Sequence, residues 1–219
     1  MAKVIVFGVG EIAEIAYFYL SNDSEHEVVA FTVDSAFSDK DSFHGLPVVP
    51  YEELVTSHPP DQFKLFIPIS YKGLNTLRAN KYLDAKSKGY GFISYISSKA
   101  RYYGTPVGEN CFIFEDNVIQ PFTKIGDNCI IWSGNHIGHH TVIDDHCFIA
   151  SHAVISGAVR IGEYSFVGVN ATIRDNIEIG KRNVIGAAAV ILKSTKDGEV
   201  YSPGGTKLFP RSSDKLRGI

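Results

Sequence analysis

Histidine residues gather in one short segment of this 219-residue chain. Five of the eight lie between positions 136 and 152, at His136, His139, His140, His146 and His152. An imidazole titrates near neutral pH, so it can take a proton from an amine or hydroxyl that attacks another molecule. The cluster therefore predicts a general base for a transfer reaction. A surface on which all five histidines are merely exposed is the alternative interpretation.

A second candidate for chemistry lies near the N-terminus, in the string GVGEIA at residues 8–13. Gly8 and Gly10 follow an apolar segment and precede a helical pattern. Two glycines permit a tight turn whose backbone approaches a phosphate at the helix N-terminus. Asp34 closes the next apolar segment, where a carboxylate can accept hydrogen bonds from a nucleotide. These residues predict a nucleotide site, and a plain glycine turn with a capping acid is the alternative.

The elements that would position this turn follow from the periodicity of the N-terminal half. Apolar runs predict strands at 3–8, 27–34 and 64–70, and helical patterns span 11–20 and 74–90. Ile12, Ile15 and Tyr19 share one face of the first helix. Alternation of strand and helix predicts a parallel sheet with a ligand crevice at the carboxyl ends of its strands. A domain that binds a dinucleotide usually needs more strands than about 100 residues supply, so we expect a ligand of mononucleotide size.

From residue 105 to residue 194 the sequence repeats every six residues. The third residue of each hexapeptide is isoleucine or valine without interruption, fifteen times from Val107 to Ile191. Neither a helix, with a period of about 3.6, nor a strand, with a period of about 2, gives this spacing. Each hexapeptide would form one short strand and one turn, and three would close a triangular coil with the β-branched residues inside. Stacked coils of this kind predict a β-helix about 24 Å tall.

Residues eighteen positions apart should stack on one another in such coils. Cys111, Cys129 and Cys147 have this spacing, and each lies four residues after an inward isoleucine or valine. We therefore predict a buried column of small residues, in keeping with the frequent burial of free cysteine. A metal site is the less favoured interpretation, and no metal is expected. The odd number of cysteines argues against a secreted disulfide scaffold.

Composition narrows the class of protein further. Hydrophobic residues make up 44% and charged residues 21% of the chain, and the net charge is -3. These values indicate a globular protein without a basic field for nucleic acid. No apolar run reaches the roughly 18 residues of a membrane helix, so no membrane partner is expected. The N-terminal segment has no signal-peptide cleavage pattern, and we expect a cytoplasmic protein.

The repeat over residues 105–195 resembles the left-handed parallel β-helix of hexapeptide acyltransferases. This resemblance, rather than the periodicity, implies the left hand. It also implies a homotrimer with acetyl-CoA as co-substrate, bound in grooves between neighbouring β-helices. Flat exposed faces and open coil ends would favour such an association.

The whole chain resembles the group of sialic-acid O-acetyltransferases and bacillosamine N-acetyltransferases. The resemblance implies an α/β Rossmann-like domain at 1–100, a left-handed parallel β-helix at 101–195 and a tail at 196–219. It implies N-acetylation of a nucleotide-linked amino sugar, a precursor of surface glycans such as lipopolysaccharide. The positions expected to hold the nucleotide sugar are Gly8, Gly10, Glu11, Ile12, Asp34 and Ser70.

The string GHHTVI at residues 138–143 matches the EHD or EHE motif that precedes a VIG-like coil in this group. The match implies that His139, two residues after the inward Ile137, is the catalytic base. His140 then stands where the group has an Asp or Glu that orients the imidazole. A neutral histidine cannot stabilise an imidazolium as a carboxylate does. Another acid therefore takes that role, or the base is weaker, or His136 is the base instead.

The resemblance also implies contacts with acyl-CoA on successive coils, at Phe148, Gly157, Val169 and Ala187. Phe148 replaces a histidine that is frequent in the family, so a backbone N–H near Gly157 is the expected donor to the thioester oxygen. A recognisable closing turn ends at Lys207. It lies in a C-terminal stretch whose excess of Lys and Arg could attract the phosphates of CoA, although a solvated surface explains that charge equally well.

Three other functions fit parts of the pattern. A γ-class carbonic anhydrase shares the β-helix but needs a zinc-binding histidine about two coils before the other two, and no histidine lies between His58 and His136. A non-catalytic trimer that binds nucleotides is the second alternative. Sugar O-acetylation is the third, and the sequence leaves it open. The lack of an acid at position 140 slightly favours an amine over a hydroxyl.

Overall fold

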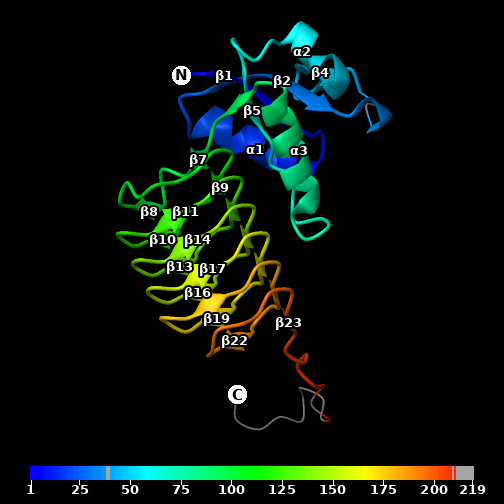
Figure 1. Cartoon of the computed structure of the whole chain (residues 1–219). Helices are drawn as coiled ribbons and strands as arrows, with labels where there is room; N and C mark the ends of the chain where they lie inside the picture. The colour runs from blue at the N-terminus through cyan, green and yellow to red at the C-terminus, as the bar shows by residue number, and fades with distance from the viewer. Residues whose placement is uncertain (38–39, 209, 211–219) are drawn as a thin grey trace.

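The computed structural model describes residues 1–37, 40–208 and 210. Figure 1 shows two parts, a sheet flanked by helices near the N-terminus and a stack of coils that continues from it towards the C-terminus. The first part arises from the alternation of strands and helices, and the second from the hexapeptide repeat. Within the described ranges, no helix is both long enough and apolar enough to cross a membrane.

The N-terminal sheet has the strand order β3-β4-β2-β1-β5-β6. Its strands are β1 (Lys3–Phe7), β2 (Glu27–Val33), β3 (Ser42–Phe43), β4 (Leu46–Pro50), β5 (Lys64–Phe66) and β6 (Gly91–Phe92). The helices are α1 (Glu11–Asn22), α2 (Leu54–Ser57) and α3 (Thr76–Ser87), with short 3-10 helices η1 (Ser35–Phe37) and η2 (Tyr51–Glu53). All neighbouring strands pair in parallel except β3 and β4. Strand β1 has β2 on one side and β5 on the other, so the connections on its two sides run in opposite directions over the sheet. The point where they separate lies beside the glycine turn, and parallel sheets of this kind bind ligands at such a point.

The third predicted strand is shorter than expected. β5 ends at Phe66, whereas the apolar pattern predicted a strand to residue 70. Beyond β5, the N–H of Ile67 donates to Asn110 Oδ1 at 2.7 Å, and its carbonyl accepts from Asn110 Nδ2 at 3.2 Å. A side chain of the β-helix thus satisfies both backbone groups of Ile67, and the chain leaves the sheet to contact the β-helix.

The buried face of α1 also differs from the prediction. Ala13, Ala16 and Leu20 are buried in this helix, whereas all three residues of the predicted face, Ile12, Ile15 and Tyr19, are only half-buried. The small alanines let the helix pack closely on the sheet. The other face packs against the hydrophobic cluster that joins the sheet to the β-helix. The helix therefore has two apolar faces, and the sequence pattern identified the one that faces the β-helix.

The C-terminal part is a β-helix with three flat faces. The first face consists of β8 (Arg101–Tyr102), β10 (Val118–Ile119), β13 (His136–Ile137), β16 (Val154–Ile155), β19 (Thr172–Ile173) and β22 (Val190–Ile191). The second consists of β11 (Lys124–Ile125), β14 (Val142–Ile143), β17 (Arg160–Ile161) and β20 (Glu178–Ile179). The third consists of β7 (Tyr95–Ile96), β9 (Phe112–Ile113), β12 (Ile130–Ile131), β15 (Phe148–Ile149), β18 (Phe166–Val167), β21 (Val184–Ile185) and β23 (Val200–Tyr201).

Strands on each face pair in parallel at a spacing of eighteen residues, as His136 does with Val154. The predicted triangular coil is therefore confirmed. We call its corners edge 1–2, edge 2–3 and edge 3–1 after the faces that they join. The stack starts earlier than the hexapeptide pattern, because β7 and β8 pair with β9 and β10 without belonging to the repeat.

The interior of the β-helix contains the inward isoleucines and valines and a column of small residues. Cys111, Cys129 and Cys147 are fully buried there, which confirms the predicted packing column. Their thiols donate to backbone carbonyls at 3.1 to 3.3 Å. Burial raises the pKa of the Cys111 and Cys129 thiols well above the usual value.

Each corner places one residue in the left-handed conformation, three positions after the inward residue. At the non-glycine members of this set, φ lies between 54° and 66°. Asparagine, aspartate, histidine, phenylalanine, tyrosine, arginine and alanine all occupy the position. A left-handed φ is uncommon outside glycine, so the stacked coils, rather than the residue type, fix this turn.

The N-terminal part packs on the third face of the β-helix. Phe112, Ile130 and Phe148 point outward there and share one hydrophobic cluster with the sheet and α1. In Figure 1, α3 lies alongside the coils of this face. Edge 1–2 is the corner opposite the third face, so it lies across the β-helix from the N-terminal part.

A buried arginine joins the two parts. Arg78 of α3 is fully buried. Its guanidinium donates to the β-helix carbonyls of Asn128, His146 and Cys147, and to those of Ile69 and Ser70 before α3, at 3.0 to 3.2 Å. These acceptors include no carboxylate. Burial lowers the pKa of Arg78 to about 10, which leaves the group charged at neutral pH.

Candidate active site

His139 lies at edge 1–2, where the chain turns after β13. The inward Ile137 fixes the register, and the His139 side chain two residues later is exposed. Its backbone N–H donates to Gln120 Oε1 of the preceding coil at 2.8 Å. The hexapeptide repeat therefore holds this imidazole at a defined place on an open edge, as predicted from the register.

The next coil approaches the ring of His139 closely. A Cβ atom at Gly157 would lie 2.7 Å from His139 Nε2, so a larger residue at 157 would displace the ring. A Cβ atom at Gly138 would lie 2.5 Å from the backbone nitrogen of Gly157. Both positions must therefore be glycine for the coils and the imidazole to pack as they do. The structure brings together two predicted site residues, His139 and Gly157.

His140 is the polar partner of His139. The two Nδ1 atoms are 3.1 Å apart, and the His140 ring packs on Phe122 with ring centroids 4.7 Å apart. Among the described residues, the one histidine that pairs with a carboxylate is His44, which contacts Glu14 in the N-terminal part. Position 140, where the resemblance implies an acid, thus supplies an imidazole, and among the residues that the structure describes no carboxylate pairs with either histidine.

The other three histidines of the cluster lie elsewhere. His136 is on the first face, half-buried between Val118 and Val154 of the adjacent strands. His146 is buried at edge 2–3, where its Nδ1 is 2.9 Å from Asn128 Nδ2, and burial lowers its pKa. His152 is exposed at edge 3–1. The five histidines are therefore spread over the β-helix, and only His139 and His140 form a pair.

The residues expected to contact acyl-CoA fall at different places. Gly157 adjoins His139, but Val169 and Ala187 lie exposed at edge 3–1 of the same chain. Phe148 is buried on the third face, where its ring contacts Tyr71 and Phe166 with centroids 5.0 and 5.5 Å apart. A covered ring packs the two parts together and offers no exposed side chain to a thioester. Lys207 is exposed beyond β23.

A cavity of about 360 Å³ opens at the glycine turn after β1. Its lining includes Gly8, Gly10, Glu11 and Ile12 of the predicted nucleotide-sugar set. Gly8 has a φ of +112°, and a Cβ atom there would lie 3.3 Å from that of Ala13. Gly10 precedes α1 and faces open space, so its backbone can be approached by a ligand.

The other two predicted nucleotide-sugar residues lie outside this lining. Asp34 Oδ1 accepts from Lys81 Nζ at 2.6 Å, so its charge is already paired. The backbone carbonyl of Ser70 accepts from Arg78. The structure thus brings four of the six predicted residues around one cavity.

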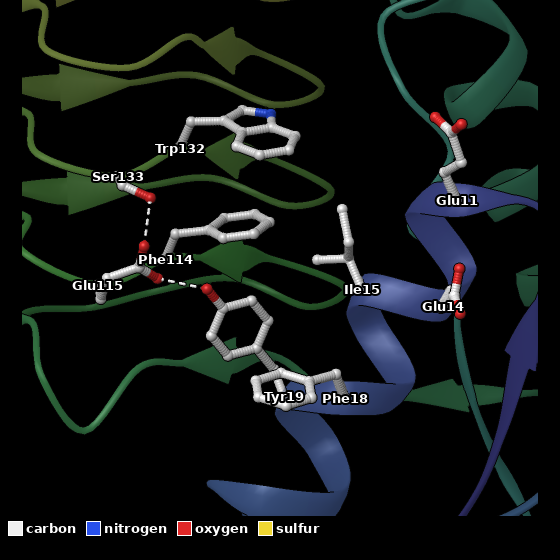
Figure 2. Close-up of a pocket in the computed structure, with 9 residues that line it drawn as sticks. All are labelled: Glu11, Glu14, Ile15, Phe18, Tyr19, Phe114, Glu115, Trp132 and Ser133. Carbon is white, nitrogen blue, oxygen red and sulfur yellow. Dashed lines mark hydrogen bonds between the residues drawn. The ribbon is translucent and has the colours of Figure 1, made fainter.

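A larger cavity, of about 500 Å³, lies between α1 and edge 3–1 (Figure 2). It is lined by Glu11, Glu14, Ile15, Phe18, Tyr19, Phe114, Glu115, Trp132 and Ser133. Trp132 stacks on Phe114 with ring centroids 4.4 Å apart and an interplanar angle of 9°. Figure 2 shows Ile15 directed towards these two rings, with Glu11 and Glu14 farther along α1. Both cavities include Glu11, so they are neighbours.

Hydrogen bonds fix the polar side of the larger cavity. Glu115 accepts from the hydroxyl of Tyr19 at 2.6 Å and from that of Ser133 at 2.7 Å (Figure 2). Burial, with the Glu115 carboxylate, raises the pKa of Tyr19 to about 12, so its hydroxyl remains a donor. Sequence reasoning missed this cavity. The signal was present, because Phe114 and Trp132 are eighteen residues apart and therefore stack on successive coils.

No group of three or more His, Cys, Asp or Glu side chains suited to hold a metal ion occurs in the part of the chain that the structure describes. The exposed histidine pair beside Gly157 suits acid–base chemistry on a bound substrate. An imidazole with one nitrogen facing an open edge can remove a proton from a nucleophile placed there.

The repeat matches the family described as bacterial transferase hexapeptide (six repeats), over residues 105–139, 122–157 and 158–193. Comparison with curated proteins finds no match. Perosamine N-acetyltransferase from Caulobacter crescentus, solved as a variant in complex with CoA and GDP-perosamine, superimposes with a TM-score of 0.79 and 22% identity, covering 91% of this chain and 93% of that one.

Two further solved structures share the fold. The acetyltransferase domain of PglB from Neisseria gonorrhoeae FA1090 has a TM-score of 0.77 and 23% identity, with 91% of this chain and 96% of that one covered. WeeI from Acinetobacter baumannii AYE has a TM-score of 0.71 and 21% identity, with the same coverage of 91% and 96%. The predicted fold class, an α/β N-terminal part followed by a left-handed parallel β-helix, is confirmed, and the predicted hexapeptide repeat matches its family model.

Proposed function

We propose that this protein is an acetyl-CoA-dependent N-acetyltransferase that acts on a nucleotide-linked amino sugar, with His139 as the general base. The observation that carries the proposal is the contact between the exposed imidazole of His139 and the backbone of Gly157. The His139 side chain is exposed, so Nε2 can be reached by a substrate at this edge beside Gly157. The shared fold with perosamine N-acetyltransferase, whose structure holds CoA and GDP-perosamine, supports the same substrate class.

The chemistry follows from these two residues. The amine attacks the thioester carbonyl of acetyl-CoA, and His139 Nε2 takes the proton that the nitrogen must lose. The carbonyl oxygen gains negative charge and requires a hydrogen-bond donor. The N–H of Gly157 has no acceptor among the described residues, so it is available for this oxygen. When the C–S bond breaks, the sulfur of CoA leaves with the electron pair and receives a proton.

The two cavities supply binding for the other half of the substrate. Backbone N–H groups at the start of α1 suit a diphosphate beside Gly8 and Gly10. The neighbouring cavity, with an aromatic floor at Trp132 and carboxylates at Glu11 and Glu14, suits the sugar ring and its amine. Glu11 joins the two, as expected if one ligand extends through both.

We further propose that the active protein is a homotrimer. The N-terminal part covers the third face, whereas His139 lies on the opposite edge, so a substrate held in the cavities does not meet the imidazole of its own chain. A neighbouring copy must provide the base. Exposed apolar side chains favour such an association, namely Val154 and Val190 on the first face and Leu192 directly after β22. Val169 and Ala187 would then contact acyl-CoA from an adjacent copy.

The predicted location in the cytoplasm and the predicted role in surface glycan or lipopolysaccharide synthesis stand on the sequence alone. They remain predictions. The domain limits at 100 and 195 are also predictions, and the pairing of β7 with β9 favours a β-helix that begins near Tyr95.

The direct test is release of free CoA when the protein is incubated with acetyl-CoA and a panel of nucleotide-linked 4-amino, 3-amino and hydroxyl sugars. Turnover of an amino sugar, with acetyl transfer to nitrogen, is expected. Turnover of hydroxyl sugars alone would replace the proposal by O-acetylation. Nucleotide binding without turnover of any sugar would favour the non-catalytic trimer.

Two variants test the site itself. His139→Asn should abolish turnover, and Gly157→Ala should do the same because the new Cβ displaces the ring. His152→Asn makes the same change at another exposed corner histidine and should leave turnover unchanged. Full turnover by His139→Asn would refute the assignment of the base.

A further inference from the structure

The pair formed by His139 and His140 has only one arrangement of protons that allows catalysis. Two Nδ1 atoms 3.1 Å apart form a hydrogen bond only if one carries a proton and the other a lone pair. If His139 is to accept a proton at Nε2, its own proton must be on Nδ1. His140 must then carry its proton on Nε2 and accept at Nδ1.

We propose that His140 holds His139 in the Nδ1–H form and shares the positive charge that develops during the reaction. This inference rests on the proposed function for the reacting step. The proton arrangement, however, is a property of the protein alone. His140 acts through His139 and is therefore a positioning residue.

The surroundings of the pair support this assignment. Gln120 holds the backbone N–H of His139, the ring of His139 lies close to Gly157, and the ring of His140 packs on Phe122. His140 is exposed, and its Nε2 can exchange protons with water. The His140 ring thus packs on Phe122 and is at the same time exposed to solvent.

The two carboxylates on the flanking elements, Asp144 and Asp175, already have partners. Arg160 pairs with Asp144 at 2.9 Å on the second face, and Arg174 lies 3.9 Å from Asp175 two coils beyond the pair. Lys124, on the adjacent strand β11, is a cation and cannot stabilise an imidazolium. None of these groups takes the role of the missing acid, which leaves His140.

The proton path is balanced through one turnover. As the C–N bond forms, the amine proton moves to His139 Nε2, and the Nδ1 proton moves towards His140 Nδ1. The charge is then spread over two imidazoles, one of them in contact with water. As the C–S bond breaks, His139 Nε2–H protonates the departing sulfur, and the Nδ1 proton returns. Both imidazoles end as they began.

The corner geometry provides matched variants. Position 140 has a φ of 59°, and the equivalent corner positions hold asparagine at 110, 128, 170 and 176 and phenylalanine at 122. His140→Asn keeps an acceptor that cannot take up a proton, whereas His140→Phe keeps a ring and removes the acceptor. His140→Asp restores a carboxylate. All three should fold, because the same corner conformation already carries these or similar residues.

The test is a long-range nitrogen–proton correlation spectrum of histidine labelled with ¹⁵N, which shows the proton position in each neutral ring. In the wild-type protein we expect His139 as Nδ1–H and His140 as Nε2–H. In His140→Phe, His139 should change to the Nε2–H form that free imidazole prefers. In His140→Asn and His140→Asp it should stay Nδ1–H. His152→Asn is the control for assignment and folding.

Kinetics give the second readout. His140→Phe should lower kcat by about 100-fold, the lower end of the usual contribution of a general base, with little change in the KM for acetyl-CoA. The kcat of His140→Asn should lie between those of His140→Phe and the wild-type protein, and the kcat of His140→Asp should be at least as high as that of the wild-type protein. An Nε2–H ring at His139 in the wild-type protein would overturn the inference. So would turnover that depends on His139 but is unaffected by His140→Phe, an outcome that leaves the proposed function intact.

Discussion

Replacement of Arg78 by methionine should separate the two parts of the molecule. Methionine has a similar length but no hydrogen-bond donor, so the buried space stays filled while every acceptor remains. The carbonyls of Ile69, Ser70, Asn128 and His146 receive no other hydrogen bond among the described residues. The carbonyl of Cys147 still accepts from Ile130.

The magnitude follows from these orphaned acceptors. A buried polar group left unsatisfied costs about 1 to 3 kcal/mol, so the two buried carbonyls, those of Asn128 and His146, give about 2 to 6 kcal/mol. The carbonyls of Ile69 and Ser70 are only partly buried and add less. Removal of the buried charge offsets part of the upper value, because no unpaired charge stays behind, so the expected net loss is about 4 kcal/mol. With a urea dependence of about 2 kcal/mol per M, the midpoint of unfolding should fall by about 2 M.

The single tryptophan makes the assay specific. Trp132 stacks on Phe114 beside α1, so its fluorescence should report separation of the N-terminal part from the third face. Circular dichroism should report the β-helix. In Arg78→Met, the fluorescence transition should move to lower urea and precede the loss of ellipticity. Arg101→Met, an exposed arginine on β8, is the matched control and should behave as wild type.

A second variant, Arg78→Lys, should have an intermediate stability. Arg78→Lys keeps the charge but offers three donors from one atom, so it can satisfy only some of the carbonyls. Its midpoint should lie between those of wild type and Arg78→Met. If Arg78→Met unfolds at the wild-type midpoint, with both signals superimposed, the carbonyl cluster does not hold the two parts together and the argument is refuted.

Three further predictions concern the glycine turn, the cysteine column and pH. Gly8→Ala should cost about 1 kcal/mol or more in unfolding free energy, since φ is +112°, whereas Gly10→Ala should leave stability unchanged and weaken nucleotide binding measured by calorimetry. A thiol-specific reagent should label no cysteine in the native protein and all three after unfolding, because all are fully buried; fast native labelling would contradict this. Burial lowers the pKa of His146 below its unfolded value, so stability should be complete above about pH 6.5 and fall on acidification below it. In urea titrations between about pH 7 and pH 5, His146→Asn should make the unfolding free energy depend less on pH. Some dependence should remain, because burial also lowers the pKa values of His26 and His58.

The hexapeptide pattern determines the β-helix from sequence because one inward residue in six sets the register of every coil. The same register placed His139 at an exposed edge and the cysteines in a buried column, and the structure agrees on both. The stacking of residues eighteen apart also indicates that position 157 adjoins position 139, but it does not tell that the imidazole ring lies against Gly157. That contact depends on the stacking of Gly157 on the next coil, eighteen residues on, and on the absence of a side chain there.

The sequence patterns do not predict how the N-terminal part contacts the β-helix. Arg78 lies in a helix of mixed polar and apolar residues, where an arginine usually points to water, and its residue type does not mark it as buried. Its acceptors are backbone carbonyls, which carry no residue-type signal. Likewise, β5 ends early because the Asn110 amide satisfies Ile67, a long-range pairing that no strand propensity encodes.

The corner positions explain how a histidine can stand where a carboxylate is expected without cost to the fold. The stacked coils impose φ values of 54° to 66° at these positions on residues as different as Asp116, Phe122 and Tyr164, so residue type there is open to change. Gly138 and Gly157 have no such freedom, because a Cβ atom at either would collide with the backbone or with His139. The chemistry of this edge can therefore vary at position 140 but not at the two glycines. If that is correct, His140→Asp and His140→Asn should unfold at the wild-type urea midpoint while differing in turnover, whereas Gly138→Ala should lose both stability and turnover.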